Sequence, residues 1–523
     1  ESFWRCLATL FLSSLLHYKS DTRTSELLSL QGSSFIATMK RQMHIFFFPF
    51  MAHGHIIPTV DMAKLFAARG VKASIITTPL NVRLFSKAID RAKSLGIDIG
   101  IKVIKFPTSE AGLPEGSESF EFVARLGEKM MRTFFDALTL LQEPLEQLLE
   151  ETRPDCLMSD MFFPWTTDVA SKFGIPRLVF HGTSYFSLCV ARCMLTSNDP
   201  LKDLSSDSDP FVVPHLPGEL KFTAKIIAPG DKQNSSNPFT KIIQSSVEAD
   251  KKSFGVIVNS FYELEPNYAD FYRDSLGIRS WSIGPMSLCN RWLEDKVTRG
   301  ERQAAITDNE CLTWLNSKEA DSVVYICFGS MSHIPSVQLK QIAMALEASG
   351  QNFIWVVRKE HKGANEEKED WLPEGFEDRM EGKGLIIRGW APQMLILDHY
   401  AVGVFVTHCG WNSTLEGISA GKTMITWPLF AEQFYNEKLV TEVLKIGVSL
   451  GIQGGSKLNE EFVSSETIET AIKRTTVDPE AEEMRIRAKN LGKLARYAIE
   501  PDGSSTSDLN SLLHEVAAFS ALD

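Results

Sequence analysis

Apolar residues recur along this chain in two alternating patterns, which together predict a parallel sheet. Residues 43–50 form a nearly continuous apolar run, as in a buried strand. After a short turn, apolar residues recur at helical spacing from Ile56 to Ala67, and Gly70 ends this predicted helix. Residues 71–77 are predicted to form the next strand. A strand, a helix and a strand at this spacing make a βαβ unit, whose two strands are parallel.

The alternation continues in two series. In the first, further strands are predicted at residues 101–106, 155–159, 177–180 and 254–259, with long helices within 120–149. In the second, strands are predicted at 323–328, 353–357, 385–387, 404–406 and 423–427, before a mostly helical tail at 480–519. We therefore expect two doubly wound α/β domains that face each other across a cleft. Ligands of such domains bind at the carboxyl ends of the strands.

Polar stretches suggest where the domains begin and end. Residues 1–38 precede the first methionine, Met39, and are predicted to be an N-terminal extension with no part in the fold. Residues 39–284 form the predicted first domain, and the polar stretch 285–320 is predicted to be a linker. Residues 321–523 form the predicted second domain, which includes the C-terminal helices.

Composition narrows the class of partner. The chain has 523 residues, and 54 basic against 66 acidic side chains give a net charge of −12. An acidic chain without a run of basic residues binds nucleic acid or an anionic membrane poorly. The apolar stretch at residues 3–16 is too short to span a bilayer. The eight cysteines are scattered without paired spacing, which favours reduced thiols in a cytoplasmic protein.

One segment has the pattern of an anion site. The predicted strand at 404–406 runs through a turn into a helix predicted at 412–420. Free backbone N–H groups and the positive end of the helix dipole then lie at the end of the sheet. His408, Asn412 and Ser413 add side-chain donors, so a phosphate or diphosphate is the expected ligand. Ser413 and Glu416 also fit a capping box, and the local pattern leaves both interpretations open.

Two other patterns are rejected. Residues 417–423 resemble a phosphate loop, but three residues separate the glycines where four are needed, and the run falls late in a helix. Asp207 and Asp209 match the carboxylate pair of a metal-dependent transferase, but they lie in a loop of low complexity. We therefore expect no metal site.

Residues 390–433 carry a resemblance to a known family. His408 to Ser413, Glu416 and the closing Glu432–Gln433 resemble, nearly end to end, the signature box of plant UDP-dependent glycosyltransferases of small molecules. The strings FFFPFMAHGHIIP and VYICFGS are similar to that family too, so the resemblance extends from about Met39 to the end. The first string is most similar to the flavonoid and scopoletin glucosyltransferase group. The resemblance implies a GT-B fold of two Rossmann-like domains and an inverting, metal-independent reaction.

The resemblance also implies how the nucleoside is held. Trp390 would stack on uracil, and the backbone of Ala391 would bond the edge of the base. Gln393 and Glu416 would take the ribose hydroxyls, and one carboxylate accepts two hydroxyl donors, which suits a cis-diol. A tryptophan beside a proline is otherwise typical of a core.

The diphosphate and the sugar would be held by the rest of the box. The residues implied to contact the diphosphate are Ser330, His408, Asn412 and Ser413. Donors aimed at the leaving diphosphate stabilise the charge that grows on it. Trp411, Glu432 and Gln433 would line the sugar pocket. Gln433 favours glucose, whereas Glu432 stands where many relatives have aspartate.

A base is needed to deprotonate the acceptor, and histidine titrates near neutrality. His53 and His55 both lie in the first strand-to-helix turn, and the family pattern indicates His55. A carboxylate would orient the imidazole and stabilise its cation. Asp160, at the end of its predicted strand, matches the family's position, and Asp168 is the weaker candidate.

The sequence therefore predicts a monomeric, cytoplasmic enzyme without a cofactor. It would transfer glucose from UDP-glucose to a hydroxyl of a small hydrophobic plant phenolic, such as a flavonoid or a coumarin. A terpenoid acceptor and a non-catalytic UDP-sugar-binding protein are the alternatives. An NAD-dependent oxidoreductase would need G-x-G-x-x-G after an early strand, and the turn here reads MAHGH.

Overall fold

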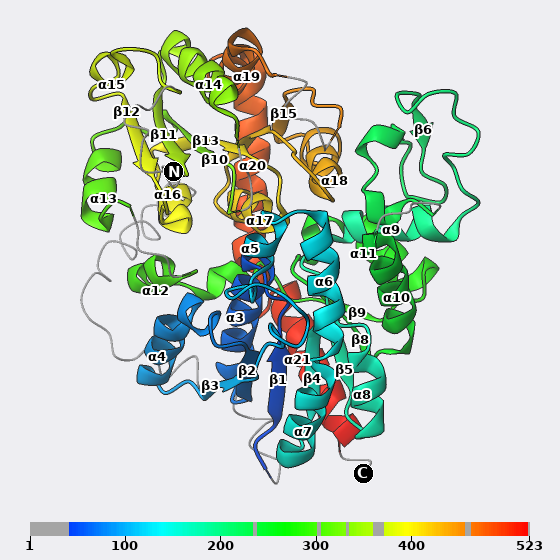
Figure 1. Ribbon diagram of the computed structural model, residues 1–523. Coiled ribbons are helices and arrows are strands. Elements are labelled where there is room, and N and C mark those ends of the chain that lie inside the picture. The colour runs from blue at the N-terminus through cyan, green and yellow to red at the C-terminus, as the bar shows by residue number, and fades with distance from the viewer. Residues whose placement is uncertain are drawn as a thin grey trace, which may run out of the picture.

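Two parallel sheets form two lobes (Figure 1). A cavity lies between the lobes. The computed structural model describes residues 41–233, 238–300, 305–330, 334–358, 371–454 and 462–520. The predicted extension at residues 1–38 lies outside these ranges. Helices cover both faces of each sheet, which confirms the predicted pair of Rossmann-like domains.

The first sheet has seven parallel strands in the order β3-β2-β1-β4-β5-β8-β9. Their bounds are β1 His44–Phe48, β2 Lys72–Thr77, β3 Ile99–Val103, β4 Cys156–Asp160, β5 Arg177–Phe180, β8 Gly255–Val258 and β9 Ser280–Ser282. Side chains of a strand alternate between the faces of its sheet. Phe47 accordingly packs toward α3 (His53–Ala67), whereas Phe46 and Phe48 pack toward α6 (Glu128–Thr139) and α7 (Gln142–Thr152). Both faces are buried, so β1 is apolar throughout.

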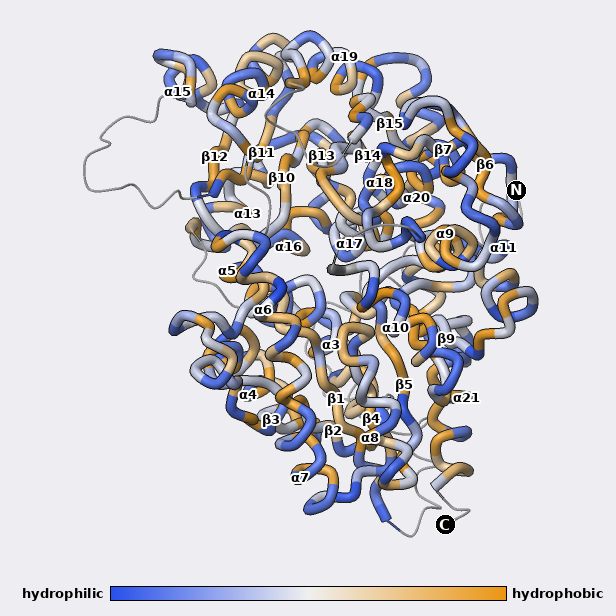
Figure 2. The backbone as a smooth tube through the Cα atoms, turned by 45° about the vertical axis from the view of Figure 1, so that its right-hand side comes forward, coloured by the Kyte–Doolittle hydropathy of each residue, from blue (hydrophilic) through white to orange (hydrophobic). Residues whose placement is uncertain are grey.

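The second sheet has six parallel strands in the order β12-β11-β10-β13-β14-β15. Their bounds are β10 Val323–Cys327, β11 Asn352–Val357, β12 Gly384–Arg388, β13 Val402–Thr407, β14 Thr423–Thr426 and β15 Gly447–Ser449. Strands of this sheet are among the more hydrophobic segments of the tube in Figure 2. All the strands predicted for this half are present, within two residues of their predicted bounds.

The predicted linker is more than a connection. It contains α12 (Leu293–Thr298) and α13 (Asp308–Asn316). On α12, Asp295 accepts a hydrogen bond from Arg91 of the first domain over 2.5 Å. The next residue, Lys296, donates to Asp398 of the second domain over 2.6 Å. The linker helix is therefore fastened to both domains.

The C-terminal helices separate. Helix α20 (Pro479–Ala498) packs against α17 (Trp411–Ser419) of the second domain. Helix α21 (Ser504–Ser520) returns to the first domain and packs beside β9, and it lies with the first sheet in Figures 1 and 2. Its buried apolar residues are Leu509, Leu512, Leu513, Val516 and Ala517. The boundary inferred at residue 321 placed α21 with the second domain, whereas its packing joins it to the first.

Within the part that the structure describes, no helix has the length and apolar character needed to cross a membrane. Seven cysteines in this part are free thiols, five of them buried.

Candidate active site

A cavity of about 2640 Å³ lies between the two domains, at the carboxyl ends of both sheets. Every residue predicted to contact a UDP-sugar lines it. These residues are Ser330, Trp390, Ala391, Gln393, His408, Trp411, Asn412, Ser413, Glu416, Glu432 and Gln433. His55 lines the same cavity from the first domain. Asp160 is fully buried behind His55.

The proposed anion site is built from β13, a short turn and α17. The helix begins at Trp411 after Gly410, and no side chain caps its first turn. The capping box of Ser413 and Glu416 is therefore wrong, because Glu416 lies in the second turn and bonds elsewhere. The N–H groups of the first turn remain open for an anion, together with the positive end of the helix dipole.

His408 lies between two glycines. A Cβ atom on Gly329 would come within 2.6 Å of the imidazole, and one on Gly410 within 2.5 Å. Burial lowers the pKa of His408 to about 4, so its ring is neutral near pH 7. Its Nδ1 has no hydrogen-bond partner among the described residues. The two glycines thus make the space in which a neutral imidazole faces the anion site.

Gly410→Ala tests this packing. Gly410 has an ordinary φ of −60°, so an alanine would strain the site through His408 alone. Overpacking of this kind costs about 1–3 kcal/mol, and we expect the Kd for UDP to rise about tenfold. Titration calorimetry measures this change. Gly454→Ala is the matched control, because its Cβ would meet nothing nearer than 4.0 Å, and equal affinities in the two variants would contradict the prediction.

The residues predicted to hold ribose already contact one another. Gln393 Nε2 donates to Glu416 Oε2 over 2.8 Å and to Ser413 Oγ over 3.1 Å. Trp390 is partly exposed to the cavity, and Gly300 of the linker lies against the edge of its indole. A hydrogen-bonded carboxylate beside a partly exposed indole can bind a diol and a base.

Arg299 is a site residue that the sequence did not indicate. Its Nη1 donates to Glu416 Oε1 over 2.5 Å, and its side chain is only 11% exposed. The sequence placed this arginine in a polar linker. An isolated arginine in such a stretch follows no periodicity, so one sequence contains no signal that would single it out.

Two of the predicted sugar residues, Glu432 and Gln433, lie where α18 (Gln433–Lys438) begins, and the third, Trp411, begins α17. Gln433 Oε1 accepts from the N–H groups of Leu429 and Phe430 over 2.8 and 3.1 Å, which fixes its orientation. Burial raises the pKa of Glu432, and the charge of His55 across the cavity lowers it by less. Trp411 Nε1 donates to Asn259 O of the first domain over 2.8 Å, so its indole also holds the domains together.

His55 lies in the first turn of α3, directly after β1. Its Nδ1 bonds Asp160 Oδ2 over 2.6 Å. Burial acts to lower the pKa of His55, but the charge of Asp160 and this hydrogen bond outweigh it and raise that pKa above 6.5. His53 pairs instead with Glu121 over 2.9 Å. Asp168 is exposed on α8 (Thr166–Lys172), so Asp160 is the carboxylate that orients the imidazole.

The acceptor end of the cavity is aromatic. The rings of Phe50 and Phe162 lie 5.4 and 5.6 Å from the ring of His55, centroid to centroid. Both residues line the cavity, whereas Phe163 and Phe180 are core residues. An apolar, planar molecule would therefore meet apolar surface beside His55.

The residues of the two rejected patterns make other contacts in the structure. Lys422 donates to the carbonyl oxygens of His399 and Val402 over 3.1 and 2.8 Å, so it serves the fold and not a phosphate. Asp209 accepts from the N–H groups of Ser205 and Ser206. Within the described ranges, no three His, Cys, Asp or Glu side chains are grouped as metal ligands.

Known proteins of one family are similar to this chain. A family model described as UDP-glucoronosyl and UDP-glucosyl transferase matches residues 301–492. Scopoletin glucosyltransferase of Nicotiana tabacum is 56% identical over 480 residues, which are 92% of this chain and 99% of that protein. UDP-glucose flavonoid 3-O-glucosyltransferase 7 of Fragaria ananassa is 51% identical over 484 residues, 91% of this chain and 96% of that protein.

A solved structure is similar over nearly the whole chain. It is Glycyrrhiza uralensis UGT73P12 complexed with glycyrrhetinic acid 3-O-monoglucuronide, which is 39% identical with a TM-score of 0.83. The match covers 92% of this chain and 97% of that one.

Proposed function

Because the chain belongs to the UDP-glucoronosyl and UDP-glucosyl transferase family, and is therefore a UDP-glycosyltransferase, we propose that it transfers glucose from UDP-glucose to a hydroxyl group of a small plant phenolic. The observation that carries this proposal is the placement of the His55–Asp160 pair and the anion site on one cavity. A UDP-binding protein without turnover would have no use for a histidine that faces its ligand and pairs with a buried carboxylate.

His55 is the general base of the proposed reaction. Asp160 accepts the Nδ1–H of His55, which leaves the Nε2 lone pair to take the proton of the acceptor hydroxyl. The acceptor oxygen forms a bond to the anomeric carbon as the bond from that carbon to the UDP oxygen breaks. Attack from the face opposite UDP inverts the configuration, and UDP leaves with the electron pair.

The second domain stabilises the leaving group. The first turn of α17, with Asn412 and Ser413, offers donors for the negative charge that develops on the diphosphate. Ser330 and the neutral imidazole of His408 complete this set. These donors stabilise the leaving diphosphate, as a divalent ion does in metal-dependent transferases. The proposed reaction therefore needs no metal and no other cofactor.

The acceptor class is supported by the aromatic wall and by the relatives. Phe50 and Phe162 suit a planar ring beside His55. Scopoletin and a flavonoid appear in the names of the two relatives. A terpenoid acceptor is the second candidate, supported by the glycyrrhetinic acid derivative bound to the Glycyrrhiza protein. Gln433, held by two backbone bonds, supports glucose as the sugar.

The site is complete within one chain, so the proposed enzyme would act as a monomer. The free, mostly buried thiols support a reducing compartment, the cytoplasm.

The proposal is tested by incubating the protein with UDP-glucose, a metal chelator and a panel of coumarins, flavonoids and triterpenoids. We expect UDP release and a β-glucoside of a phenolic, detected by mass spectrometry and NMR. A chelated sample should be as active as an untreated one. UDP binding without any glucoside, or activity that returns only with a divalent ion, would contradict the proposal.

A further inference from the structure

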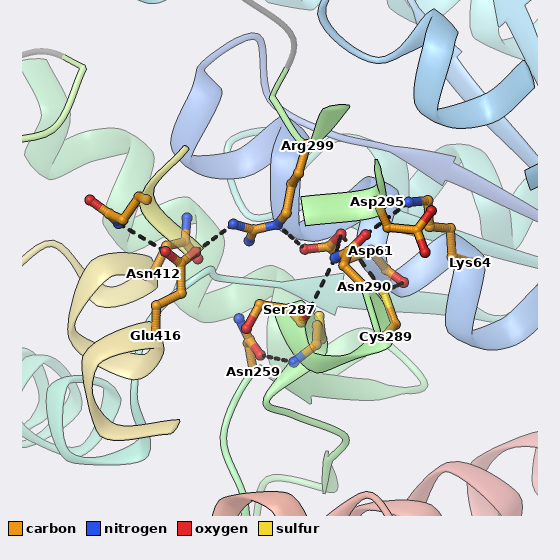
Figure 3. A network of polar contacts seen from close by, with 12 residues as sticks. Asp61, Lys64, Asn259, Ser287, Cys289, Asn290, Asp295, Arg299, Asn412 and Glu416 are labelled. Carbon is orange, nitrogen blue, oxygen red and sulfur yellow. Dashed lines mark hydrogen bonds and ion pairs between the residues drawn. The ribbon is translucent and has the colours of Figure 1, made fainter. Parts of the chain in front are cut away.

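A continuous series of polar contacts crosses between the domains beside the cavity, and Arg299 lies at its centre (Figure 3). Arg299 follows α12 in the linker. Its Nε donates to Asp61 Oδ2 over 2.7 Å, and its Nη1 donates to Glu416 Oε1 over 2.5 Å. The side chains of Arg299, Asp61 and Glu416 are only 11%, 1% and 6% exposed. Water therefore competes little for these bonds.

The two ends of this series belong to the two halves of the site. Asp61 lies on α3, within two turns of His55. Glu416 lies on α17, whose first turn faces the anion site. A second bond runs beside the first, because Asn412 Nδ2 donates to Gly54 O over 2.7 Å. The helix of the base and the helix of the donor site are thus joined through the guanidinium of Arg299 and by one direct hydrogen bond.

Charge keeps Arg299 in this place. Buried carboxylates are costly unless a positive group pairs with them, and Arg299 pairs with two. Burial acts to lower the pKa of Arg299, but the charges of Asp61 and Glu416 outweigh it and raise that pKa. The other oxygen of Asp61 accepts from Asn290 Nδ2 over 2.8 Å, which fixes that end.

Glu416 is held at both oxygens before any ligand arrives. Arg299 bonds Oε1 and Gln393 bonds Oε2, over 2.5 and 2.8 Å. Each carboxylate oxygen has about two lone-pair sites, so each keeps one for a hydroxyl group. An acceptor pair fixed in this way can receive a cis-diol without first losing rotamer freedom.

We propose that Arg299 is a positioning residue that holds Glu416 ready for the ribose hydroxyls of UDP-glucose and ties it to the helix of His55. This inference deepens the proposed function and rests on it. Arg299 acts through Glu416, so its contribution depends on the two hydroxyl groups of the ribose.

The test measures the Kd values of UDP and of 2′,3′-dideoxyuridine 5′-diphosphate by titration calorimetry. Both ligands are titrated into the full-length wild-type protein and into Arg299→Gln. We expect the substitution to weaken UDP binding about tenfold, since one charged hydrogen bond orients Glu416. Binding of the dideoxy analogue should change by less than about twofold, because it has no hydroxyl for Glu416. Equal weakening of both ligands, or no weakening of either, would overturn the proposal.

Two further variants make the result specific. Arg91→Gln is the matched control. Arg91 bonds Asp295 of the linker helix α12 over 2.5 Å, and its replacement should leave the Kd values of UDP and of the dideoxy analogue unchanged. If Arg299→Gln does not fold, Arg299→Lys replaces it. Lysine keeps the charge but lacks the fork that bonds two carboxylates, so an intermediate loss, again confined to UDP, is expected. Equal losses for both ligands would overturn the proposal here too.

A kinetic measurement separates this inference from the proposed function. Arg299→Gln should raise the KM for UDP-glucose more than it lowers kcat. If Arg299→Gln weakened UDP binding alone but the wild-type protein formed no glucoside, the proposed function would be contradicted and the role of Arg299 would stand.

Discussion

Replacing His55 by alanine is expected to lower kcat by about 1000-fold, since general bases contribute about 10²–10⁴-fold. Alanine cannot take the acceptor proton, and Asp160 is buried too deeply to replace it. The donor contacts belong to the second domain, so the Kd for UDP should stay within about twofold. Glucoside formation under saturating donor, together with titration calorimetry for UDP, measures both effects.

His53→Gln is the control for this experiment. His53 lies two positions away on the same turn and is buried against Glu121. Its ring is directed to a different carboxylate, so we expect turnover within about tenfold of the wild type. If His55→Ala kept more than a tenth of the activity, or if His53→Gln lost as much as His55→Ala, the base would have to be another group.

Asp160→Asn is expected to lower kcat at pH 7 by about 10²–10⁴-fold. An asparagine amide would donate to His55 Nδ1, which would move the ring proton to Nε2 and remove the acceptor of the substrate proton. The charge that stabilises the imidazolium would be lost as well. The backbone N–H of Phe162, which now bonds Asp160 Oδ1 over 3.1 Å, could still bond the amide oxygen.

The pH dependence of kcat/KM should shift in a definite direction in Asp160→Asn. The pKa of His55 is raised in the wild type, so the fall of kcat/KM on the acid side should lie above pH 6.5, the ordinary value for histidine. Without the charge of Asp160, burial lowers the pKa of His55, and the acid limb should move to lower pH. Asp168→Asn is the matched control, because that carboxylate is exposed. An unmoved limb in Asp160→Asn would contradict the pairing.

Much of the fold was predictable because its signals are local. The strand at residues 44–48 is buried on both faces, so it appears as an apolar run that needs no knowledge of its partners. The positions of His55, just after β1, and of Asp160, at the end of β4, follow from the same signals, since parallel strands end at one edge of a sheet. That they pair was implied only by the family pattern.

Features that depend on distant contacts were missed. Ser413 and Glu416 have the spacing of a capping box, but the helix begins at Trp411, and Glu416 pairs with an arginine 117 positions away. No local pattern indicates that Arg299 reaches the site, because its partners come from two different domains. The same holds for α21, whose helical pattern was evident but whose packing partner was not.

The path of α21 has a consequence for synthesis of the protein. Five apolar residues from Leu509 to Ala517 complete the core of the first domain. More than two hundred residues, which form the linker and the second domain, separate them from β9 (Ser280–Ser282). Domains generally fold as units as the chain leaves the ribosome. The first domain therefore cannot complete its core when its own strands have been synthesised. Part of its apolar surface stays exposed until α21 has been synthesised, so the first domain completes its folding after the second domain has been made.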